Sequence, residues 1–322
     1  MKMTRREVVK LGLAAIPAAG LRRLAAEQPD SKFAGVQIGI IVSPYNFPSI
    51  PLPADAFLKT LVQLGLSAVE IQDVRCEVYA GAPSKPREGY SGSPHLTAEE
   101  RAAAARKQAE ELRQWRLQNT AAILGKLKTL RRMYEDAGVK IYALRLANTT
   151  VEMADAEYDY FFNAARVLGA NQITTELPED PKLSQRLGDL GARHSIYVGY
   201  HNHLQVNAHS WDTALQQSKW NAIQLDVGHY AAAVSGSPIP FMKEHHDRIV
   251  SMHLKDRNYR SHGAANLPWG QGETQVKDVL LTMKQEHYTF PAGIELEYKI
   301  PEGSTPEKEI ENCLAFCRKA LS

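Results

Sequence analysis

Short apolar runs that end in polar residues recur through the second half of the chain, and they constrain its fold more than any other feature. Five such runs are QITTE, IYVGYHNH, AIQLDVGH, IVSMHLKD and AGIELEY. Segments of helical pattern separate them, so strand and helix alternate as in a parallel sheet or a (β/α)8 barrel. A buried strand gains nothing from a carboxylate or an imidazole at its end unless that end opens onto a site.

Three further apolar runs in the first half complete a set of eight strands. We expect strands over 35–43, 67–74 and 140–147, because each run is too short for a helix and is bounded by Gly, Pro or Ser. Eight strands and eight intervening helices predict one α/β domain, a (β/α)8 TIM barrel over residues 31–322. The expected helices begin near residues 54, 97, 153, 181, 211, 238, 276 and 305.

A long loop and an extended helix are expected after the second strand. Residues 80–95 are rich in Gly, Pro and Ser without periodicity, which predicts a loop over the barrel mouth. Thr97 and Glu100 form a capping-box pattern at the start of a helical run that ends at Gly138. A solvated, charged helix without a functional role explains this run equally well.

The N-terminus has the pattern of an export signal. Arg5 and Arg6 precede the short apolar stretch LGLAAIPAAG, which is too short to span a bilayer. Twin arginines before a weakly hydrophobic stretch are typical of Tat-type signals, so residues 1–30 are predicted to be a signal peptide and linker. The expected location is periplasmic or otherwise exported, and the alternative is a basic amphipathic N-terminal helix.

Composition restricts the partners. The chain has 38 basic and 36 acidic residues, a formal charge of +2 that gives no reason to expect nucleic acid or an anionic membrane. Three cysteines cannot pair completely, and Cys313 and Cys317 lie four apart in a helical pattern, as packed side chains do. The expected partner is a small-molecule carbohydrate, and homo-oligomerisation stays open.

The strand ends suit a divalent metal ion. In such barrels active sites lie at the carboxyl ends of the strands, which would gather Glu176, His201, Asp226, His253 and Glu295 around one mouth. Carboxylates with imidazoles and no thiolate favour one divalent ion, with Mn²⁺ as first choice and Co²⁺, Mg²⁺ or Zn²⁺ as alternatives. A single strand-end histidine is usually structural, whereas an unpaired acid in an apolar strand is costly, so Asp226 and Glu295 are the most informative.

These motifs resemble a known family. LDVGH, HLKD and IELE, following a YHNH strand, are similar to the sugar phosphate isomerase/epimerase family with the xylose-isomerase-like barrel, over residues 35 to 320. That family includes ketose 3-epimerases, inosose dehydratase and 3-keto-glycoside-cleaving enzymes. The ketose 3-epimerases hold their metal with an acid on strand five, Asp on six, His on seven and Glu on eight. The resemblance implies Asp226, His253 and Glu295 as the last three ligands.

The chain departs from this pattern on strand five, where His201 stands in place of the acid. We infer that Glu176, on strand four, supplies the missing carboxylate, and His201 is the competing fourth ligand. The YHNH run is more similar to the inosose dehydratase and keto-glycoside branch, in which imidazoles near the metal can move protons next to a carbonyl. The expected acid/base residues are His201, His203, His229 and Lys255.

Four residues are expected to contact the substrate: Glu70, Arg145, Trp269 and Glu297. Trp269 lies in the segment LPWGQGET (267–274), which resembles the family's Gly-rich substrate loop, although an ordinary turn is the alternative. The leading hypothesis is a metal-dependent isomerase, epimerase or carbon–oxygen lyase that abstracts a proton next to the carbonyl of a sugar, keto-sugar or 3-keto-glycoside. A non-catalytic exported sugar-binding protein is the alternative, and it needs neither a metal nor a basic group beside its ligand.

Overall fold

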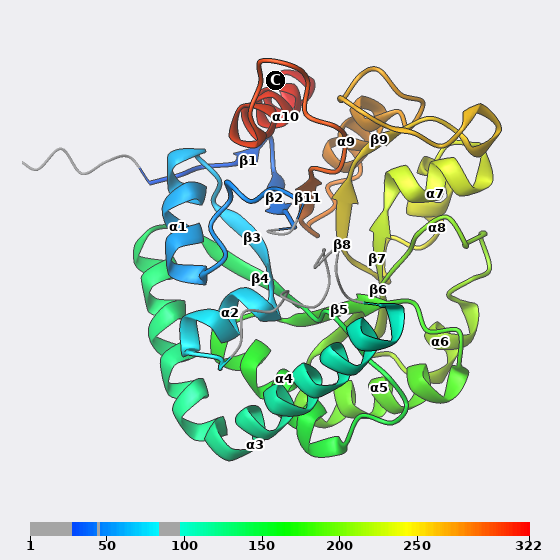
Figure 1. Ribbon diagram of the computed structural model, residues 1–322. Coiled ribbons are helices and arrows are strands. Elements are labelled where there is room, and N and C mark those ends of the chain that lie inside the picture. Colours follow the sequence, from blue (N-terminus) through cyan, green and yellow to red (C-terminus); the bar gives the residue numbers. More distant parts are fainter. Residues whose placement is uncertain (1–27, 44–45, 84–96) are drawn as a thin grey trace, which may run out of the picture.

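A curved parallel sheet surrounded by helices makes up the computed structural model, which describes residues 28–43, 46–83 and 97–322 (Figure 1). The sheet order is β1-β2-β11-β8-β7-β6-β5-β4-β3, and only the β1–β2 pair is antiparallel. The strands are β1 (Lys32–Phe33), β2 (Val36–Ile41), β3 (Ala68–Gln72), β4 (Lys140–Arg145), β5 (Gln172–Glu176), β6 (Tyr197–His201), β7 (Asn221–Asp226), β8 (Ile249–Leu254) and β11 (Ala292–Glu295).

The first and last strands of the parallel series, β2 and β3, lie next to each other and close the barrel. The side-chain amide of Gln72 donates to the carbonyl of Val42 at 2.9 Å, and a Cβ on Gly39 would lie 3.3 Å from the carbonyl oxygen of Ala68. The predicted TIM barrel with eight parallel strands is therefore confirmed.

Helices cover the outside of the sheet. They are α1 (Ala54–Gln63), α2 (Asp73–Ala80), α3 (Ala98–Asp136), α4 (Asp155–Leu168), α5 (Pro181–His194), α6 (Asp212–Gln217), α7 (Val227–Val234), α8 (Ile239–Glu244), α9 (Val276–Gln285) and α10 (Pro306–Leu321). The eight predicted helices are present. A small hairpin of β9 (Asp256–Arg257) and β10 (Asn266–Leu267), with the 3₁₀ turn Arg260–His262, follows β8.

Two helices, α2 and α7, were not predicted. The sequence predicted strand as far as Val74, but the strand ends at Gln72 and α2 begins with Asp73. In the same way α7 follows β7 without a loop, and Asp226 is both the last residue of the strand and the N-cap of the helix. In both cases no loop residue separates the strand from the helix, so the sequence carries no break at either boundary.

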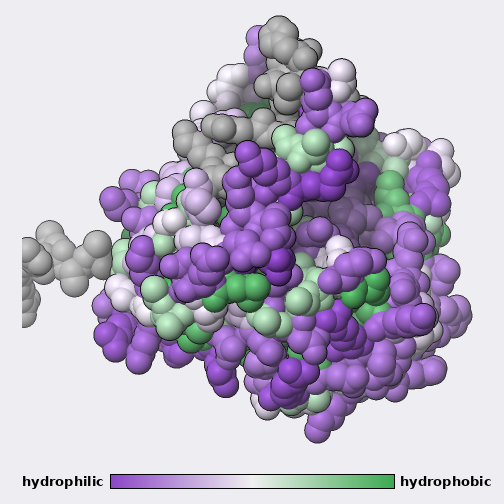
Figure 2. All heavy atoms as spheres, turned by 60° about the horizontal axis from the view of Figure 1, so that its bottom comes forward, coloured by the Kyte–Doolittle hydropathy of each residue, from purple (hydrophilic) through white to green (hydrophobic). Residues whose placement is uncertain are grey.

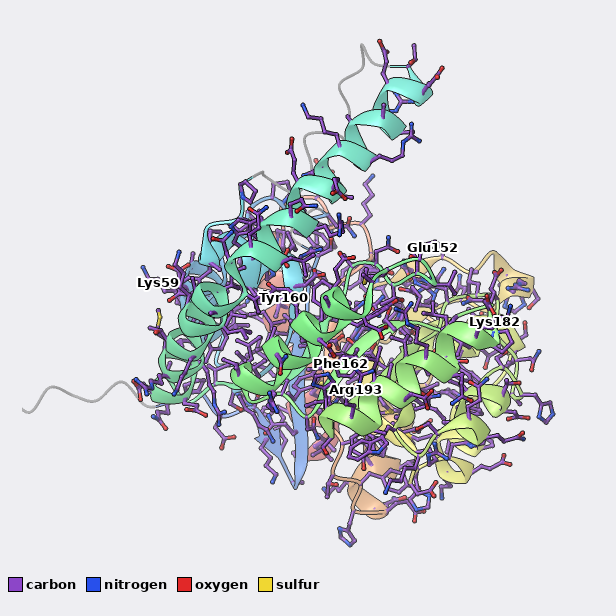
Figure 3. The ribbon with its side chains drawn as sticks, turned by 90° about the horizontal axis from the view of Figure 1, so that it is seen from below. Lys59, Glu152, Tyr160, Phe162, Lys182 and Arg193 are labelled. Carbon is purple, nitrogen blue, oxygen red and sulfur yellow. The ribbon has the colours of Figure 1, made fainter. Side chains whose placement is uncertain are left out.

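The extended helix α3 has the predicted ends. Thr97 Oγ1 accepts from the amide of Glu100 at 3.2 Å, and the Glu100 carboxylate accepts from the amide of Thr97 at 2.6 Å. Gly138, with φ of 76°, lies just beyond the last turn. The N-terminal turns extend beyond the rest of the protein, whereas the C-terminal half packs on the barrel (Figure 3). The predicted loop before α3 lies largely outside the described residues, so its position over the mouth stays a prediction.

A tyrosine fills the barrel interior. Tyr142 projects from β4 towards two glycines, Gly39 and Gly293, which face each other across the β2–β11 pair. A Cβ on Gly39 would lie 2.7 Å from the Tyr142 ring, and a Cβ on Gly293 would lie 2.8 Å from its hydroxyl. Both strands therefore need glycine here, because any side chain would displace Tyr142.

One face of the molecule is mainly polar. The face in Figure 2 is largely hydrophilic, with hydrophobic side chains in small, scattered patches. No helix among the described residues is long and apolar enough to cross a membrane.

Candidate metal centre

Four neighbouring strands bring four polar side chains together at their carboxyl ends. His201 ends β6, Asp226 ends β7, His253 lies near the end of β8 and Glu295 ends β11. One potential ligand atom from each residue lies within 4.8 Å of the others. We call these four residues the metal group. Three of them are buried, and the Glu295 side chain is 15% exposed.

Asp226 is held by its helix and by a neighbouring asparagine. Its Oδ1 accepts from the amide of His229 at 2.7 Å, as an N-cap does. Asn202 accepts from the amide of Asp226 at 2.9 Å and donates to its carbonyl at 3.2 Å. Asn202, which lies between the two histidines of YHNH, was not predicted as a site residue. One Asp226 oxygen is thus fixed on α7, while Oδ2 remains for another partner.

His253 lies between two carboxylates. Its Nε2 is 2.9 Å from Glu70 and its Nδ1 is 3.0 Å from Glu295. Burial opposes a charge on the ring, but Glu295 and Glu70 outweigh it and raise the pKa of His253 to about 10. The surroundings therefore favour positive charge at this position, as a cation site does.

Two buried atoms of the metal group lack hydrogen-bond partners in the described part of the chain. They are His201 Nδ1 and Asp226 Oδ2, although Lys255 Nζ lies 3.1 Å from Oδ2 at ion-pair distance without hydrogen-bond alignment. Burial, together with His253, lowers the pKa of His201 well below its usual value, so its imidazole is neutral. Neutral imidazole and carboxylate are the ligand forms of metal-binding side chains. The residues therefore fit a divalent ion with nitrogen and oxygen ligands.

Lys255 lies beside the metal group. Its buried Nζ is 2.9 Å from Glu295 and donates to Glu297 at 2.7 Å. Burial opposes the ammonium charge, but the surrounding carboxylates, led by Asp226, outweigh it and raise the pKa of Lys255. Lys255 therefore stays charged and accounts for the position of Glu297, whose side chain is 27% exposed.

His229 lies between two cations. Lys255 Nζ is 2.9 Å from its Nε2, and Arg257 Nη1 is 2.9 Å from its Nδ1. Burial and the Lys255 charge lower the pKa of His229, so the ring is neutral. His201, His203 and His229 form a second group that could hold a metal, but an ion there would face both cations. Arg257 follows HLKD directly and was overlooked in the sequence.

Solved structures of similar shape share this barrel. A xylose isomerase domain protein from Planctomyces limnophilus matches with a TM-score of 0.58 and 15% identity, over 89% of this chain and 98% of the other. The chain has the xylose-isomerase-like TIM-barrel fold. No protein-family model matches the sequence, and no curated protein matches it either.

Two further structures carry the xylose-isomerase-like barrel. A sugar phosphate isomerase/epimerase from Parabacteroides distasonis has a TM-score of 0.56 and 16% identity, over 89% of this chain and 97% of that one. The probable 3-DHS dehydratase involved in petrobactin synthesis, from Bacillus anthracis, has a TM-score of 0.58 and 12% identity, over 86% and 97%. At such identities the likeness establishes the fold alone.

Glu176 lies at the rim of the mouth and not in the metal group. Its carboxylate pairs with the Arg145 guanidinium and lies 3.2 Å from His203 Nε2, and its side chain is 48% exposed. The structure therefore groups His201, rather than Glu176, with the other three proposed ligands. The His203 ring centroid lies 4.9 Å from that of His201 and 4.5 Å from that of His229, so His203 connects the rim with the buried group.

Glu70 and Trp269 are placed differently from the substrate contacts that the sequence suggested. Glu70 is completely buried beneath His253. Trp269 packs edge-on against Phe316 of α10, at a centroid distance of 5.7 Å, and lines a cavity of about 320 Å³ that includes no member of the metal group. Asp256 holds this loop by accepting from the amides of Gly270, Gly272 and Thr274.

Proposed function

We propose that the protein is a metal-dependent carbohydrate-modifying enzyme, an isomerase, epimerase or carbon–oxygen lyase that abstracts a proton next to a carbonyl. The metal group carries this proposal, because four ligand types converge at the strand ends where such barrels hold their active sites. The solved structures named as a sugar phosphate isomerase/epimerase and a probable dehydratase support a chemistry of this class.

The metal group would hold one divalent ion through His201, Asp226, His253 and Glu295, with Mn²⁺ as first choice. The bound ion would polarise a carbonyl or a pair of hydroxyl oxygens and make the neighbouring C–H more acidic. Because three of these side chains are buried, water is largely excluded from the floor of the mouth.

His203 is our candidate base. Its ring is half exposed above the metal group, and the contact with Glu176 at 3.2 Å fixes its orientation. His203 would take the proton from carbon and return it to the adjacent carbon or to a departing oxygen. In an epimerisation a second group, with Lys255 as the candidate, would supply the proton to the opposite face. Lys255 lies beside the metal group, where its ammonium can donate to a substrate oxygen. His229 supports Lys255 from behind, with its two ring nitrogens facing Lys255 and Arg257.

Charge balance favours an uncharged substrate. The described part of the mouth contains three side-chain cations, Arg145, Lys255 and Arg257. A divalent ion would bring their total to the charge of the five carboxylates. These carboxylates belong to Glu70, Glu176, Asp226, Glu295 and Glu297. A free sugar, keto-sugar or glycoside therefore suits this site better than a phosphorylated sugar.

The decisive experiment combines metal analysis with a substrate screen. Purified protein loaded with Mn²⁺ is offered keto-sugars, glycosides and 3-keto-glycosides in deuterated water, and products and carbon-bound deuterium are measured. His203→Ala should lower turnover by roughly two to four orders of magnitude while metal content is unchanged. If no product forms and tight sugar binding survives in His203→Ala, the protein is a sugar-binding protein and the proposal is wrong.

Export by a Tat-type signal is a second, separate proposal. It is supported by Arg5 and Arg6 before a short apolar stretch, in a segment that lies outside the described residues. Replacing both arginines by lysine should leave precursor in the cytoplasm, as measured by cell fractionation. Normal export of the double variant would show that the signal is of another type.

A further inference from the structure

We propose that Glu70 is a positioning residue, which fixes the ring of His253 so that Nδ1 faces the metal. This inference rests on the proposed metal site, and it gives Glu70 a role other than the substrate contact suggested by the sequence. Glu70 lies in β3, across the barrel from β8, and its side chain is entirely buried.

Three strands direct hydrogen-bond donors at the Glu70 carboxylate. Thr174 of β5 donates to Oε1 at 2.5 Å, and the amide of Gln224 of β7 donates to Oε2 at 2.5 Å. His253 Nε2 of β8 lies 2.9 Å from the same Oε2. A carboxylate with such partners accepts and does not donate, so the proton on this side of the imidazole belongs to Nε2.

The other side of the ring follows from this tautomer. In the absence of metal, Nδ1 donates to Glu295 Oε2, 3.0 Å away. A bound ion would replace this proton and take the Nδ1 lone pair, because Glu70 keeps the other proton on Nε2. Metal-binding histidines usually donate their second N–H to a carboxylate or carbonyl in this way, which sets ring orientation and ligand basicity. Because Glu70 is 0% exposed beneath the ring, it reaches the substrate only through His253.

Two irregularities in strand pairing lie next to Glu70 and Gln224. The β3–β4 register shifts between Val69 and Glu70, and the β7–β8 register shifts between Ile223 and Gln224. Both shifts come directly before a residue that points at the other across the barrel. In each case the extra residue lies on the partner strand, Tyr142 on β4 and Val250 on β8. Glu70 and Gln224 therefore keep the regular alternation of β3 and β7, which turns both side chains inward.

A second row of polar groups supports Gln224. Its amide lies 3.5 Å from Ser251 Oγ, which donates to Gln172 Oε1 at 3.0 Å. The Gln172 amide donates to the carbonyl of Val250 at 3.1 Å, so the row ends on the bulged segment of β8. Buried networks of this kind restrict each member to one orientation, and here they converge on Glu70.

Calorimetric titration of metal-free protein with Mn²⁺ tests the inference without any substrate. Glu70→Gln should weaken Mn²⁺ binding by about tenfold to a hundredfold, since the amide offers one acceptor oxygen in place of two and carries no charge. The matched control is Glu309→Gln, because this buried carboxylate also accepts three side-chain hydrogen bonds but touches no member of the metal group. Its Mn²⁺ affinity should stay within about twofold of wild type, against the larger loss expected for Glu70→Gln.

The outcomes separate the two proposals. Wild-type protein that binds no divalent ion sinks both the metal-dependent function and the role of Glu70. Wild-type binding with equal affinity in a folded Glu70→Gln variant sinks the role of Glu70 alone. If that variant does not fold, Thr174→Val decides, because it keeps the carboxylate and removes one of its donors. Affinity weakened at least about twofold supports the inference, and unchanged affinity overturns it.

A nuclear magnetic resonance measurement reads the tautomer directly. In ¹⁵N-histidine-labelled protein loaded with Zn²⁺, the His253 ring should show a slowly exchanging Nε2–H and a metal-shifted Nδ1. Glu70→Gln should speed exchange of that proton. A His253 ring bound to Zn²⁺ through Nε2 in the wild type would contradict the proposed geometry.

Discussion

Two clusters of charged side chains in the interior differ in how many of their polar atoms have hydrogen-bond partners. In the cluster between α2, α3 and α4, Arg116 donates to both oxygens of Glu77, at 2.6 and 2.9 Å, and the hydroxyl of Tyr160 donates to the same carboxylate at 3.2 Å. Figure 3 places Tyr160 between α3 and α4. Asp73 accepts from the amides of Val74 and Ala147. The metal group, in contrast, leaves His201 Nδ1 and Asp226 Oδ2 without hydrogen bonds.

The presence of buried acceptors without donors distinguishes a candidate site from a structural cluster better than burial does. Glu77 and Asp226 are both nearly inaccessible, yet among the described residues only Asp226 belongs to a group whose potential ligand atoms all lie within 4.8 Å of one another. A cluster whose buried acceptors all receive hydrogen bonds joins helices, and a cluster with acceptors left over marks a site. The comparison predicts that metal binding and stability respond to different substitutions.

Asp226→Asn should have the largest effect. Replacing an anionic ligand by a neutral amide should reduce Mn²⁺ affinity by more than about a hundredfold, beyond the loss typical for groups that only orient a ligand. Asparagine still caps a helix, so α7 and the melting temperature should be nearly unchanged. Metal analysis and calorimetry check the two parts. Full metal occupancy in this variant would break the assignment of the site.

The fourth ligand is tested next, by comparing His201→Ala with Glu176→Gln. His201 belongs to the metal group and Glu176 pairs with Arg145 at the rim, so only the first variant should lose metal, by about a hundredfold. Glu176→Gln should keep its metal and lose some turnover, because His203 loses the anion that orients it. Loss of metal from Glu176→Gln alone would restore the carboxylate ligand that the sequence suggested.

Much of this site could be predicted from the sequence, because strand ends are visible as ends of apolar runs. Asp226, His253 and Glu295 were placed correctly at one mouth, since their strands are neighbours in any barrel of this order. The sequence could not show which strand-end residues lie at the buried floor of the mouth and which lie at its exposed rim. Glu176 and His201 are register partners on β5 and β6, and only the packed structure shows that one is exposed and the other buried.

Contacts between residues far apart in the sequence account for most of the remaining differences. Glu70 was predicted to contact the substrate, but it accepts from Thr174 and Gln224 and contacts His253, and each of these partners lies at least 104 positions away in the sequence. The position of Trp269 depends on Asp256, which draws its loop towards β9 and away from the mouth. The helix α7 was hidden because Asp226 serves as strand end, helix cap and candidate ligand together.

Glu77→Gln tests whether the cluster between α2, α3 and α4 contributes to stability and not to metal binding. The substitution leaves the partly buried Arg116 without its counter-charge, although the amide still accepts one hydrogen bond. We expect a loss of about 2–3 kcal/mol in the free energy of unfolding, below the cost of leaving a buried charge wholly unpaired. Chemical denaturation measures this loss, and Mn²⁺ affinity should equal that of wild type. If Glu77→Gln instead weakened metal binding and left stability unchanged, the assignment of a purely structural role to this cluster would be wrong.

The smallest effect is a pH dependence of stability that belongs to the paired cluster alone. Burial, together with Glu77, raises the pKa of Asp73 from 3.8 to about 6. The folded protein thus holds this proton more tightly than the unfolded chain, so the stabilisation is complete below pH 4 and is lost as pH rises through 6. Relative to Asp73→Asn, wild-type protein should lose about 1–3 kcal/mol of unfolding free energy between pH 4 and 7.5. Denaturation of both proteins across this range measures the difference, and metal affinity at fixed pH should be the same in both. A difference that stays constant with pH would mean that Asp73 is already ionised in the folded protein at pH 4, and that Arg116 compensates both acids of the cluster.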